Sequence, residues 1–213
     1  MMIHAYSEDY LNNAQKTLGD MMDYAVNTYE FSPNQFYEMF LVSDVSMQFQ
    51  TGNPTYVAGK TGCELVKEVL RKSGLLIPEL EDEMYLDKSP EYWCGWALAY
   101  YQWYTGRSFM KIYHAVSIEE ILNMYPVYHE MDISRFVETI NEKWDQYYVE
   151  TNLKRLRMLS GLSQSELAKR SGVALRQIQL FEQRQRDINH TRAIDVLSLA
   201  REIGCKSEEL LEI

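Results

Sequence analysis

The stretch SQSELAKRSGVALRQIQLFEQRQ, from Ser163 to Gln185, decides the fold of the C-terminal part of the chain. Ser163 is followed three residues later by Glu166, a spacing that forms a capping box and starts a helix. Gly172 can adopt the positive φ that a sharp turn requires. Apolar residues resume at helical spacing after this glycine. The stretch therefore predicts two short helices joined by a tight turn.

The spacing of small and apolar residues in this stretch fits a helix-turn-helix. Leu167 and Ala168 face inward, and Ala168 is small where a crossing helix comes close. Val173, Ile178 and Phe181 stand one, six and nine residues after the glycine and give the second helix its apolar face. This is the arrangement in which two short helices pack across each other through a tight turn.

At these residues the sequence resembles the Cro/repressor-like (XRE-type) helix-turn-helix family over residues 152–211. NLKRLRMLSGLSQSELAKRSGV is similar to the family's first two helices, ALRQIQLFEQ to its recognition helix with the characteristic Glu182, and AIDVLSLAREIGCKSEELL to its closing helices. The resemblance implies a five-helix lambda-repressor-like domain in a sequence-specific DNA-binding transcription regulator. It also implies a homodimer, because this module reads half-sites one DNA turn apart.

The resemblance further implies a set of DNA contacts. In the family, the residue that matches Gln164 touches the DNA backbone. Exposed positions of the next helix enter the major groove, and here these are Leu175, Arg176, Gln177, Gln179, Leu180 and Gln183. Arginine can bind guanine with two hydrogen bonds, glutamine can pair with adenine, and leucine can pack on a thymine methyl. Phosphate contacts that position the domain are expected from Arg155, Lys169, Arg184 and Arg186.

Two positions depart from the family pattern. Ala174 stands where the family usually has a serine or threonine that caps the recognition helix, and this loss costs about 1 kcal/mol. Arg184 stands where the family commonly has glycine, and QRDINHTR makes the following loop longer than usual. The fold is expected to survive both changes, but no particular base code follows.

The charge of the chain divides unevenly along its length, although the formal net charge is −10. Residues 1–150 contain 10 Lys and Arg against 23 Asp and Glu, whereas residues 151–213 contain 11 against 8. Such asymmetry predicts two modules with different partners. We place an acidic module at residues 1–148 and a basic, DNA-binding module at residues 149–213.

The acidic module is predicted to be a bundle of six or seven helices. Apolar residues recur at helical spacing nearly everywhere, and no alternating strand pattern is found. Ser32 and Ser89, each before a proline, and the capping box at Ser117 mark helix starts. LLIPELEDEMYLDKSP is the one long, acidic connection. The whole chain is therefore expected to be all-α.

The segment PEYWCGWALAYYQWYTG, residues 90–106, is apolar or aromatic on every side. This pattern is typical of a helix at the centre of a bundle. Alternatively, Tyr92, Trp96, Tyr100 and Trp103 line a groove that receives a partner, because tryptophan and tyrosine dominate binding hot spots. The sequence does not separate these interpretations.

The stretches GNPTYVAGKTGCEL, EYWCGWALAYYQW and YHEMD look like parts of N-terminal domains in bacterial regulators of toxin–antitoxin-like operons. The resemblance implies an antitoxin-type repressor that binds its own operator and neutralises a basic toxin protein with its acidic bundle. An acidic rim steers a basic partner toward the bundle.

Two other functions stay open for the bundle. RSFMKIYH resembles the R-x6-H signature of HEPN-type ribonucleases, in which Arg107 would hold phosphate and His114 would serve in acid–base chemistry from the same helix face. A small-molecule-sensing repressor would instead bind a ligand in the aromatic interior. The antitoxin interpretation requires no catalysis.

The stretch GNPTYVAGKTG, residues 52–62, ends like a phosphate-binding loop but lacks its first glycine. Pro54 occupies that position, and proline offers no N–H donor to phosphate. The stretch is interpreted as a turn that leads into a helix starting near Thr61.

The remaining features predict a soluble, cytoplasmic protein without cofactors. No apolar run is long enough for a membrane span, and no signal peptide is evident. The three cysteines lie far apart, as expected of free thiols. His129, Glu130 and Asp132 are too close in sequence to point at one metal ion, so no metal site is expected.

Overall fold

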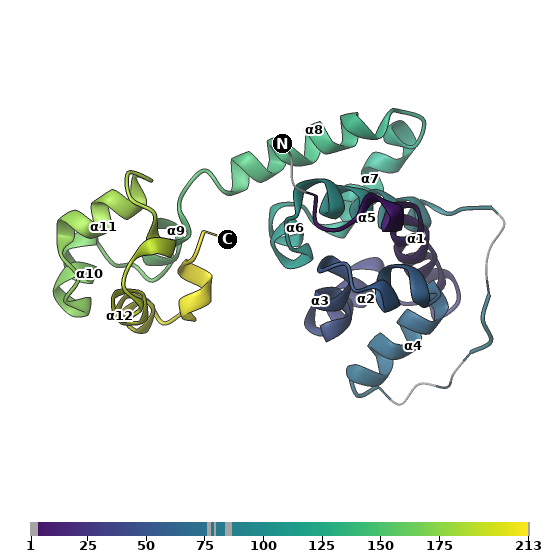
Figure 1. The fold of residues 1–213 in the computed structure, drawn as a ribbon, viewed down its shortest axis with the longest axis horizontal. Coiled ribbons are helices and arrows are strands. Elements are labelled where there is room, and N and C mark those ends of the chain that lie inside the picture. Colours follow the sequence, from purple (N-terminus) through teal and green to yellow (C-terminus); the bar gives the residue numbers. More distant parts are fainter. Residues whose placement is uncertain (1–3, 76–77, 79, 84–86, 213) are drawn as a thin grey trace. The chain divides into compact units, whose positions relative to one another are not determined.

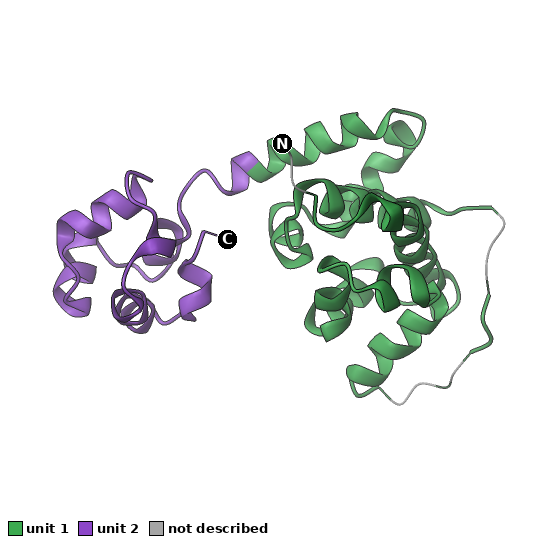
Figure 2. Ribbon diagram, viewed as in Figure 1, with its two compact units in different colours: residues 1–144 green, residues 145–213 purple. Residues whose placement is uncertain are grey.

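The structure, a computed structural model, describes residues 4–75, 78, 80–83 and 87–212. Every regular element in this described part of the chain is helical (Figure 1), so the all-α prediction is confirmed. The chain forms two compact units, residues 1–144 and residues 145–213 (Figure 2). The boundary predicted from the sequence lies between residues 148 and 149.

Eight α-helices lie in the described residues up to Tyr147, where the sequence predicts six or seven. They are α1 (Leu11–Asn27), α2 (Pro33–Val42), α3 (Asp44–Gln50), α4 (Gly62–Lys72), α5 (Pro90–Thr105), α6 (Phe109–Ala115), α7 (Ile118–Tyr128) and α8 (Ile133–Tyr147). Only Ser43 separates α2 from α3, a break too short for apolar spacing to reveal.

The predicted helix starts are confirmed. Ser32 and Ser89 precede prolines at the first turns of α2 and α5, and each hydroxyl accepts a hydrogen bond from the N–H of the third helical residue. Ser117 and Thr61 begin α7 and α4 with capping boxes. The helix predicted to start near Thr61 therefore does so, and the Lys60 ammonium of the GKT stretch pairs with Glu68.

The acidic connection between α4 and α5 lies partly outside the described residues, which omit 76, 77, 79 and 84–86. Within its described part, the Tyr24 hydroxyl donates to the carbonyls of Leu80 (3.2 Å) and Glu81 (2.8 Å). Lys67 pairs with Asp82 at 2.8 Å. These contacts hold the segment against α1 and α4.

The central helix of the N-terminal unit is α5, which packs along α1. Its backbone comes close to that of α1, because a Cβ atom on Gly95 would lie 2.3 Å from the Leu18 carbonyl oxygen. The core of this unit also contains large, fully buried aromatic side chains: Tyr24, Tyr37, Tyr101, Phe36, Phe40, Phe49, Phe109 and Phe136. The aromatic segment at residues 90–106 thus forms a buried helix, as its composition predicts.

The C-terminal unit has four further α-helices: α9 (Asn152–Leu159), α10 (Gln164–Ser171), α11 (Leu175–Glu182) and α12 (Ala193–Ile203) (Figure 1). Two short 3-10 turns, Ile188–His190 and Ser207–Leu210, complete it, and the second stands where the resemblance places a fifth helix. The unit has its own core, which includes Leu153, Leu167, Ile178, Phe181 and Leu199. This core presents α10 and α11 on the surface.

Candidate nucleic-acid interface

The turn between α10 and α11 is built by local hydrogen bonds. The Ser163 hydroxyl accepts from the Glu166 N–H (3.1 Å), and the Glu166 carboxylate accepts from the Ser163 N–H (2.8 Å). Gly172 ends α10 with a φ of +72°, and its N–H donates to the Ala168 carbonyl (3.0 Å). Ala174 provides no side-chain cap to α11. The chain therefore turns where the sequence predicts, and α11 lacks the acceptor that Ser163 gives α10.

A buried ion pair joins three helices of this unit. The Arg157 guanidinium on α9 donates to both carboxylate oxygens of Glu182 on α11, from Nε to Oε1 (2.6 Å) and from Nη2 to Oε2 (2.9 Å). Gln164 at the start of α10 donates to the same carboxylate (2.8 Å). The hydrogen bonds to Glu182 raise the pKa of Arg157, so the guanidinium stays charged. The glutamate thus fixes α9, α10 and α11 together and holds Gln164.

The outward side of α11 carries the residues predicted to contact bases. The exposed ones are Leu175, Arg176 and Gln183. The half-buried ones are Gln177, Gln179 and Leu180. The four polar side chains of this set form no hydrogen bond or ion pair with any described residue. The opposite side of the helix packs into the core through Ile178 and Phe181. The polar groups of the outward side are therefore available to a partner.

The basic residues of the unit fall into paired and unpaired groups. Lys154 pairs with Glu150, Arg157 with Glu182, and Arg192 with Asp195. Among the cations that form no ion pair with a described residue are Lys169, Arg176, Arg186 and Arg201. The first three of these lie on α10, α11 and the following loop. The sequence could not show which cations lack a partner.

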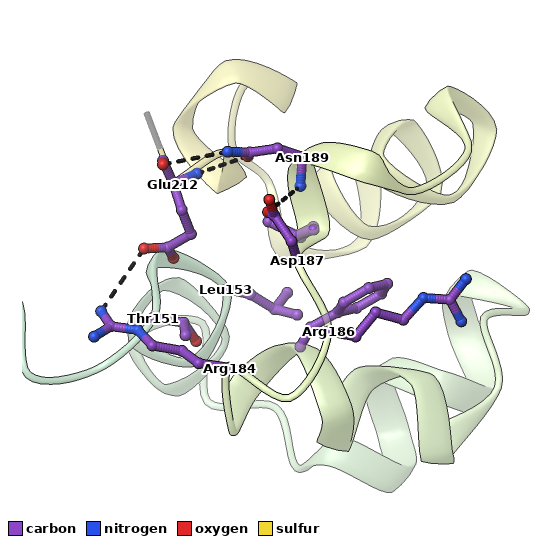
Figure 3. A pocket seen from close by; sticks show the side chains of 9 residues that line it. Thr151, Leu153, Arg184, Arg186, Asp187, Asn189 and Glu212 are labelled. Carbon is purple, nitrogen blue, oxygen red and sulfur yellow. Dashed lines mark hydrogen bonds and ion pairs between the residues drawn. The ribbon is translucent and has the colours of Figure 1, made fainter.

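The loop after α11 is held by the last residues of the chain (Figure 3). Asn189 and Glu212 exchange two hydrogen bonds, from the Glu212 N–H to Asn189 Oδ1 (2.9 Å) and from Asn189 Nδ2 to the Glu212 carbonyl (3.2 Å). Asp187 caps the 3-10 turn by accepting from the Asn189 N–H (2.8 Å). The loop borders a hollow of about 370 Å³ whose lining includes the buried Leu153 and Ile188. These contacts order the long loop.

Arg184 adopts a backbone conformation that favours glycine. Its φ is +54°, in the left-handed region, at the position where the resemblance expects glycine. The guanidinium donates to the Tyr148 carbonyl (3.1 Å) and lies 3.8 Å from the Glu212 carboxylate. The Arg184 guanidinium, which is predicted to contact phosphate, therefore already binds groups within the unit, whereas Arg186 is exposed.

Arg155, also predicted to contact phosphate, is engaged as well. Its guanidinium lies against the rings of Tyr147 (5.4 Å) and Tyr148 (5.7 Å) and donates to Asn152 (2.9 Å). These interactions leave the residue little freedom to reach DNA.

Residues 153–210 match a family model described as Helix-turn-helix. They form an XRE-type helix-turn-helix domain. The match covers less than a third of the chain and identifies a DNA-binding domain of transcription regulators. Comparisons with curated proteins and with solved structures found no match. The helix-turn-helix domain contains every residue that the sequence analysis assigns to DNA.

A second candidate site lies in the N-terminal unit, where a hollow of about 420 Å³ is lined mostly by rings. α5 contributes Tyr92, Trp93 and Trp96, and α7 contributes Tyr125 and Tyr128. The lining also includes Lys88, Ser89, His129, Met131 and Ile133. The sequence does not predict the contribution of the α7 rings, because nothing local in YPVYHEM places them beside α5.

The structure separates the four aromatic residues predicted to bind a partner. Tyr92 and Trp96 line the hollow. Tyr100 is half-buried and stacks with Tyr104, at 5.9 Å between ring centroids. Trp103 is only 5% exposed and its indole N–H donates to the Tyr6 carbonyl (2.9 Å), so it does not line a surface groove.

The expectation that Arg107 and His114 share one helix face is wrong. α6 begins at Phe109, so Arg107 lies in the connection before it, while His114 is near its end. The Arg107 guanidinium is 4.0 Å from the centre of the Trp144 ring and donates to Asn141 (2.6 Å). Arg107 therefore has a packing role in this unit.

No group of three His, Cys, Asp or Glu residues among the described ones could hold a metal ion. The three cysteines, Cys63, Cys94 and Cys205, carry free thiols. Among the described helices, none is long and apolar enough to cross a membrane.

Proposed function

We propose that this chain is a repressor whose helix-turn-helix domain binds a double-stranded operator, with α11 in the major groove. The observation that carries the proposal is the position of the unpaired cations Lys169, Arg176 and Arg186 on α10, α11 and the loop after it. A cation that has no internal partner can neutralise a phosphate without first breaking an ion pair. Phosphate neutralisation supplies much of the affinity of proteins for DNA.

The outward residues of α11 differ in chemistry, so each type would contact a different base. Arg176 would bind guanine, Gln177, Gln179 and Gln183 would pair with adenine, and Leu175 and Leu180 would pack on thymine methyl groups. The phosphate contacts come from Gln164, Lys169, Arg184 and Arg186. The Arg184 guanidinium is bound to Tyr148 and Glu212, so it would have to leave these two groups before it could contact a phosphate. Two copies of the chain would read two half-sites one DNA turn apart.

We also propose that the acidic N-terminal unit binds a basic partner protein, as an antitoxin binds its toxin. Residues 1–150 carry 23 acidic residues against 10 basic ones, which attracts a partner of opposite charge. The hollow lined by Tyr92, Trp96 and Tyr125 offers an aromatic anchoring site of the kind found at interface hot spots. The size of the same hollow supports a second candidate function, the sensing of a small apolar ligand.

The DNA proposal is tested by selecting duplexes from a random pool with the full chain. The Kd of the selected duplex is then measured against salt for wild type and for variants. Arg176→Ala should relax specificity at one base pair, at a cost of about 1–3 kcal/mol. Lys169→Ala should weaken all duplexes alike and lower the salt slope by about 1 per copy.

The control for these variants is Lys154→Ala, because Lys154 already pairs with Glu150 at 2.6 Å. It should leave affinity and specificity nearly unchanged. Recovery of no duplex from the pool contradicts DNA binding, and identical effects of Arg176→Ala and Lys169→Ala contradict the placement of α11 in the groove.

The partner proposal is tested by co-expressing the chain with the product of the neighbouring open reading frame. Purification should recover a stable complex with a basic protein. Trp96→Ala, in the hollow, should reduce the recovery, whereas Met110→Ala, exposed elsewhere in the unit, should not. Absence of a complex, together with stabilisation by a small apolar compound in a thermal-shift screen, favours sensing.

A further inference from the structure

The hollow of about 420 Å³ in the N-terminal unit is lined by rings that contact one another. The ring of Tyr125 on α7 meets that of Trp93 on α5 edge to face, at 5.8 Å between centroids, and stacks on His129 at 4.4 Å. Tryptophan and tyrosine faces carry negative partial charge and attract a cation that lies within about 6 Å. The aromatic lining is completed by Tyr92, Trp96 and Tyr128.

One cation of this chain already lies over a ring at the hollow. The Lys88 ammonium is 4.2 Å from the centre of the Tyr92 ring and pairs with the Asp20 carboxylate at 2.8 Å. No cation of the described residues lies over the rings of Trp96 or Tyr125. Most of the aromatic lining is therefore open to a cation from another molecule.

The same unit shows how a guanidinium binds in such surroundings. Arg107 lies 4.0 Å from the centre of the Trp144 ring and donates a hydrogen bond to the Asn141 side-chain oxygen at 2.6 Å. A ring thus contacts the flat face of the guanidinium while an oxygen accepts from its edge, which are the two kinds of contact that arginine can make together.

The rim of the hollow offers oxygens of this kind. Glu130 and Asp132 flank Met131, whose side chain lines the hollow, and all three residues are exposed. The Glu130 carboxylate lies 3.7 Å from the His129 ring nitrogen and forms no other ion pair with a described residue. Carboxylates beside an aromatic lining favour a cationic occupant over an apolar or anionic one.

The exposure of the rim indicates that the occupant belongs to a larger molecule. Met131 is 49% exposed, and the Lys88 side chain is 38% exposed. A small-molecule site usually encloses its ligand, whereas an open hollow can receive a side chain that projects from a partner. Arginine suits it better than lysine, because its planar group stacks on rings and is less strongly hydrated.

We propose that the hollow binds an arginine side chain of a basic partner protein, with the guanidinium on the rings of Trp96 and Tyr125 and beside the Glu130 carboxylate. This inference deepens the proposed partner binding and rests on it for the source of the arginine. Lys88 is then a competing cation at the Tyr92 end of the hollow.

The test titrates the full chain, by isothermal titration calorimetry, with a short capped peptide that has one arginine between glycines. The matched ligand has citrulline in place of arginine, which keeps nearly the same shape without the charge. The arginine peptide should bind with a Kd at least about tenfold lower, which corresponds to about 1.4 kcal/mol. Equal Kd values, or binding of neither peptide, overturn the inference.

Two variants of the hollow locate the binding. Trp96→Leu keeps an apolar side chain but removes the ring, and should raise the Kd of the arginine peptide about fivefold. Lys88→Gln removes the competing charge but keeps a donor for Asp20, and should lower the Kd. An unchanged Kd for Trp96→Leu, or a higher one for Lys88→Gln, contradicts the placement of arginine in the hollow.

A pair of exposed variants separates a contact at the rim from the general acidity of the unit. Glu130→Gln and Glu138→Gln each remove one negative charge, and both side chains are exposed, at 83% and 61%. Both variants should fold, which circular dichroism checks. Glu130→Gln should raise the Kd of the arginine peptide and Glu138→Gln should not. Equal effects overturn the inference.

Tetramethylammonium tests the other source of a cation. It carries the charge without a peptide chain and without hydrogen-bond donors. Weaker binding of tetramethylammonium than of the arginine peptide supports the proposal. Tighter binding would assign the hollow to a small organic cation and overturn the arginine of a partner.

Co-expression with the product of the neighbouring open reading frame separates this inference from the proposed function. If no complex forms but the arginine peptide still binds and Trp96→Leu weakens it, the partner function fails and the arginine site stands. If a complex forms but the chain does not distinguish arginine from citrulline, the arginine site fails and the partner function stands.

Discussion

Arg157 and Glu182 face each other across α9 and α11 through two hydrogen bonds, Nε–Oε1 at 2.6 Å and Nη2–Oε2 at 2.9 Å, in the interior of the helix-turn-helix domain. Both residues are buried. Two charges removed from water depend on each other, because either one alone keeps its desolvation cost without the compensating attraction. The orientation of α11 within the domain therefore depends on a pair buried in its interior.

Arg157→Met should lower the free energy of unfolding of the C-terminal unit by about 3–5 kcal/mol, because it leaves the Glu182 carboxylate buried without a cation. The double variant Arg157→Met/Glu182→Leu should recover much of this loss. The measurement is urea unfolding followed by circular dichroism. Tryptophan fluorescence reports the other unit, since all four tryptophans lie within residues 1–144. A single variant as stable as wild type contradicts the role given to the pair.

Arg184→Gly should stabilise the C-terminal unit while it weakens DNA binding. The left-handed conformation at φ +54° costs a residue other than glycine about 1–2 kcal/mol. The exposed contact with Glu212, at 3.8 Å, offsets little of this. We expect a net gain of about 1 kcal/mol in the free energy of unfolding measured with urea, together with a higher Kd for DNA because the proposed phosphate contact is lost.

The matched control is Gln185→Gly, next in the chain, where φ is not positive. This change should destabilise the unit by about 0.5–1 kcal/mol, because glycine gains freedom in the unfolded chain. Equal destabilisation by both variants contradicts the strain at Arg184.

Local signals account for the part of the fold that the sequence predicts. The capping pair Ser163 and Glu166, the turn at Gly172 and the start at Ser89 each depend on residues only a few positions apart. The capping boxes and the positive φ form without help from distant parts of the chain. At Arg184, where the family usually has glycine, the backbone adopts the left-handed conformation that favours glycine.

Contacts between distant residues account for what the sequence does not predict. Whether Trp103 lies on a groove or in the core depends on its hydrogen bond to Tyr6, which is 97 residues away in the chain. The pairing of α5 and α7 rings around one hollow likewise arises only when those helices pack together. The same holds for the cations, since Lys169 and Arg192 look alike in the sequence but only Arg192 has a carboxylate partner.

Glu68 should make the stability of the N-terminal unit depend on pH. Burial acts to raise the pKa of the Glu68 carboxyl, but hydrogen bonds from Lys60, Lys72 and Tyr56 outweigh it and lower the pKa to about 2. The unfolded value is about 4.3, so the stabilisation is complete above about pH 5 and is lost as the pH falls toward 2.

Glu68→Gln should therefore lower the free energy of unfolding at pH 7 by on the order of 2–3 kcal/mol and have much less effect near pH 2. Urea unfolding at both pH values, followed by tryptophan fluorescence, checks this. Glu138→Gln, at an exposed pair with Arg135, is the control and should change little. A loss from Glu68→Gln that is the same at both pH values contradicts the electrostatic origin.

Gly95→Ala should destabilise the N-terminal unit by several kcal/mol. The added Cβ would lie 2.3 Å from the carbonyl oxygen of Leu18 and 3.0 Å from the Gly19 Cα, so α1 and α5 would have to separate. Gly59→Ala, whose Cβ would lie 3.3 Å from the Pro54 carbonyl, should cost much less. Tryptophan fluorescence during urea unfolding compares the two, and similar midpoints contradict the close approach of α1 and α5.

Ala174→Ser should stabilise the helix that is proposed to read DNA. Ala174 has φ −58° and ψ 135°, the extended conformation of a capping residue, but no side-chain acceptor. A serine hydroxyl there can accept from an N–H group of the first turn of α11 and add about 1 kcal/mol. Ser163→Ala is the matched opposite, since it removes an existing cap and should cost a similar amount. Urea unfolding by circular dichroism should therefore shift in opposite directions for the two variants. A shift of the same sign would mean that surrounding packing, and not the caps, decides where α10 and α11 begin.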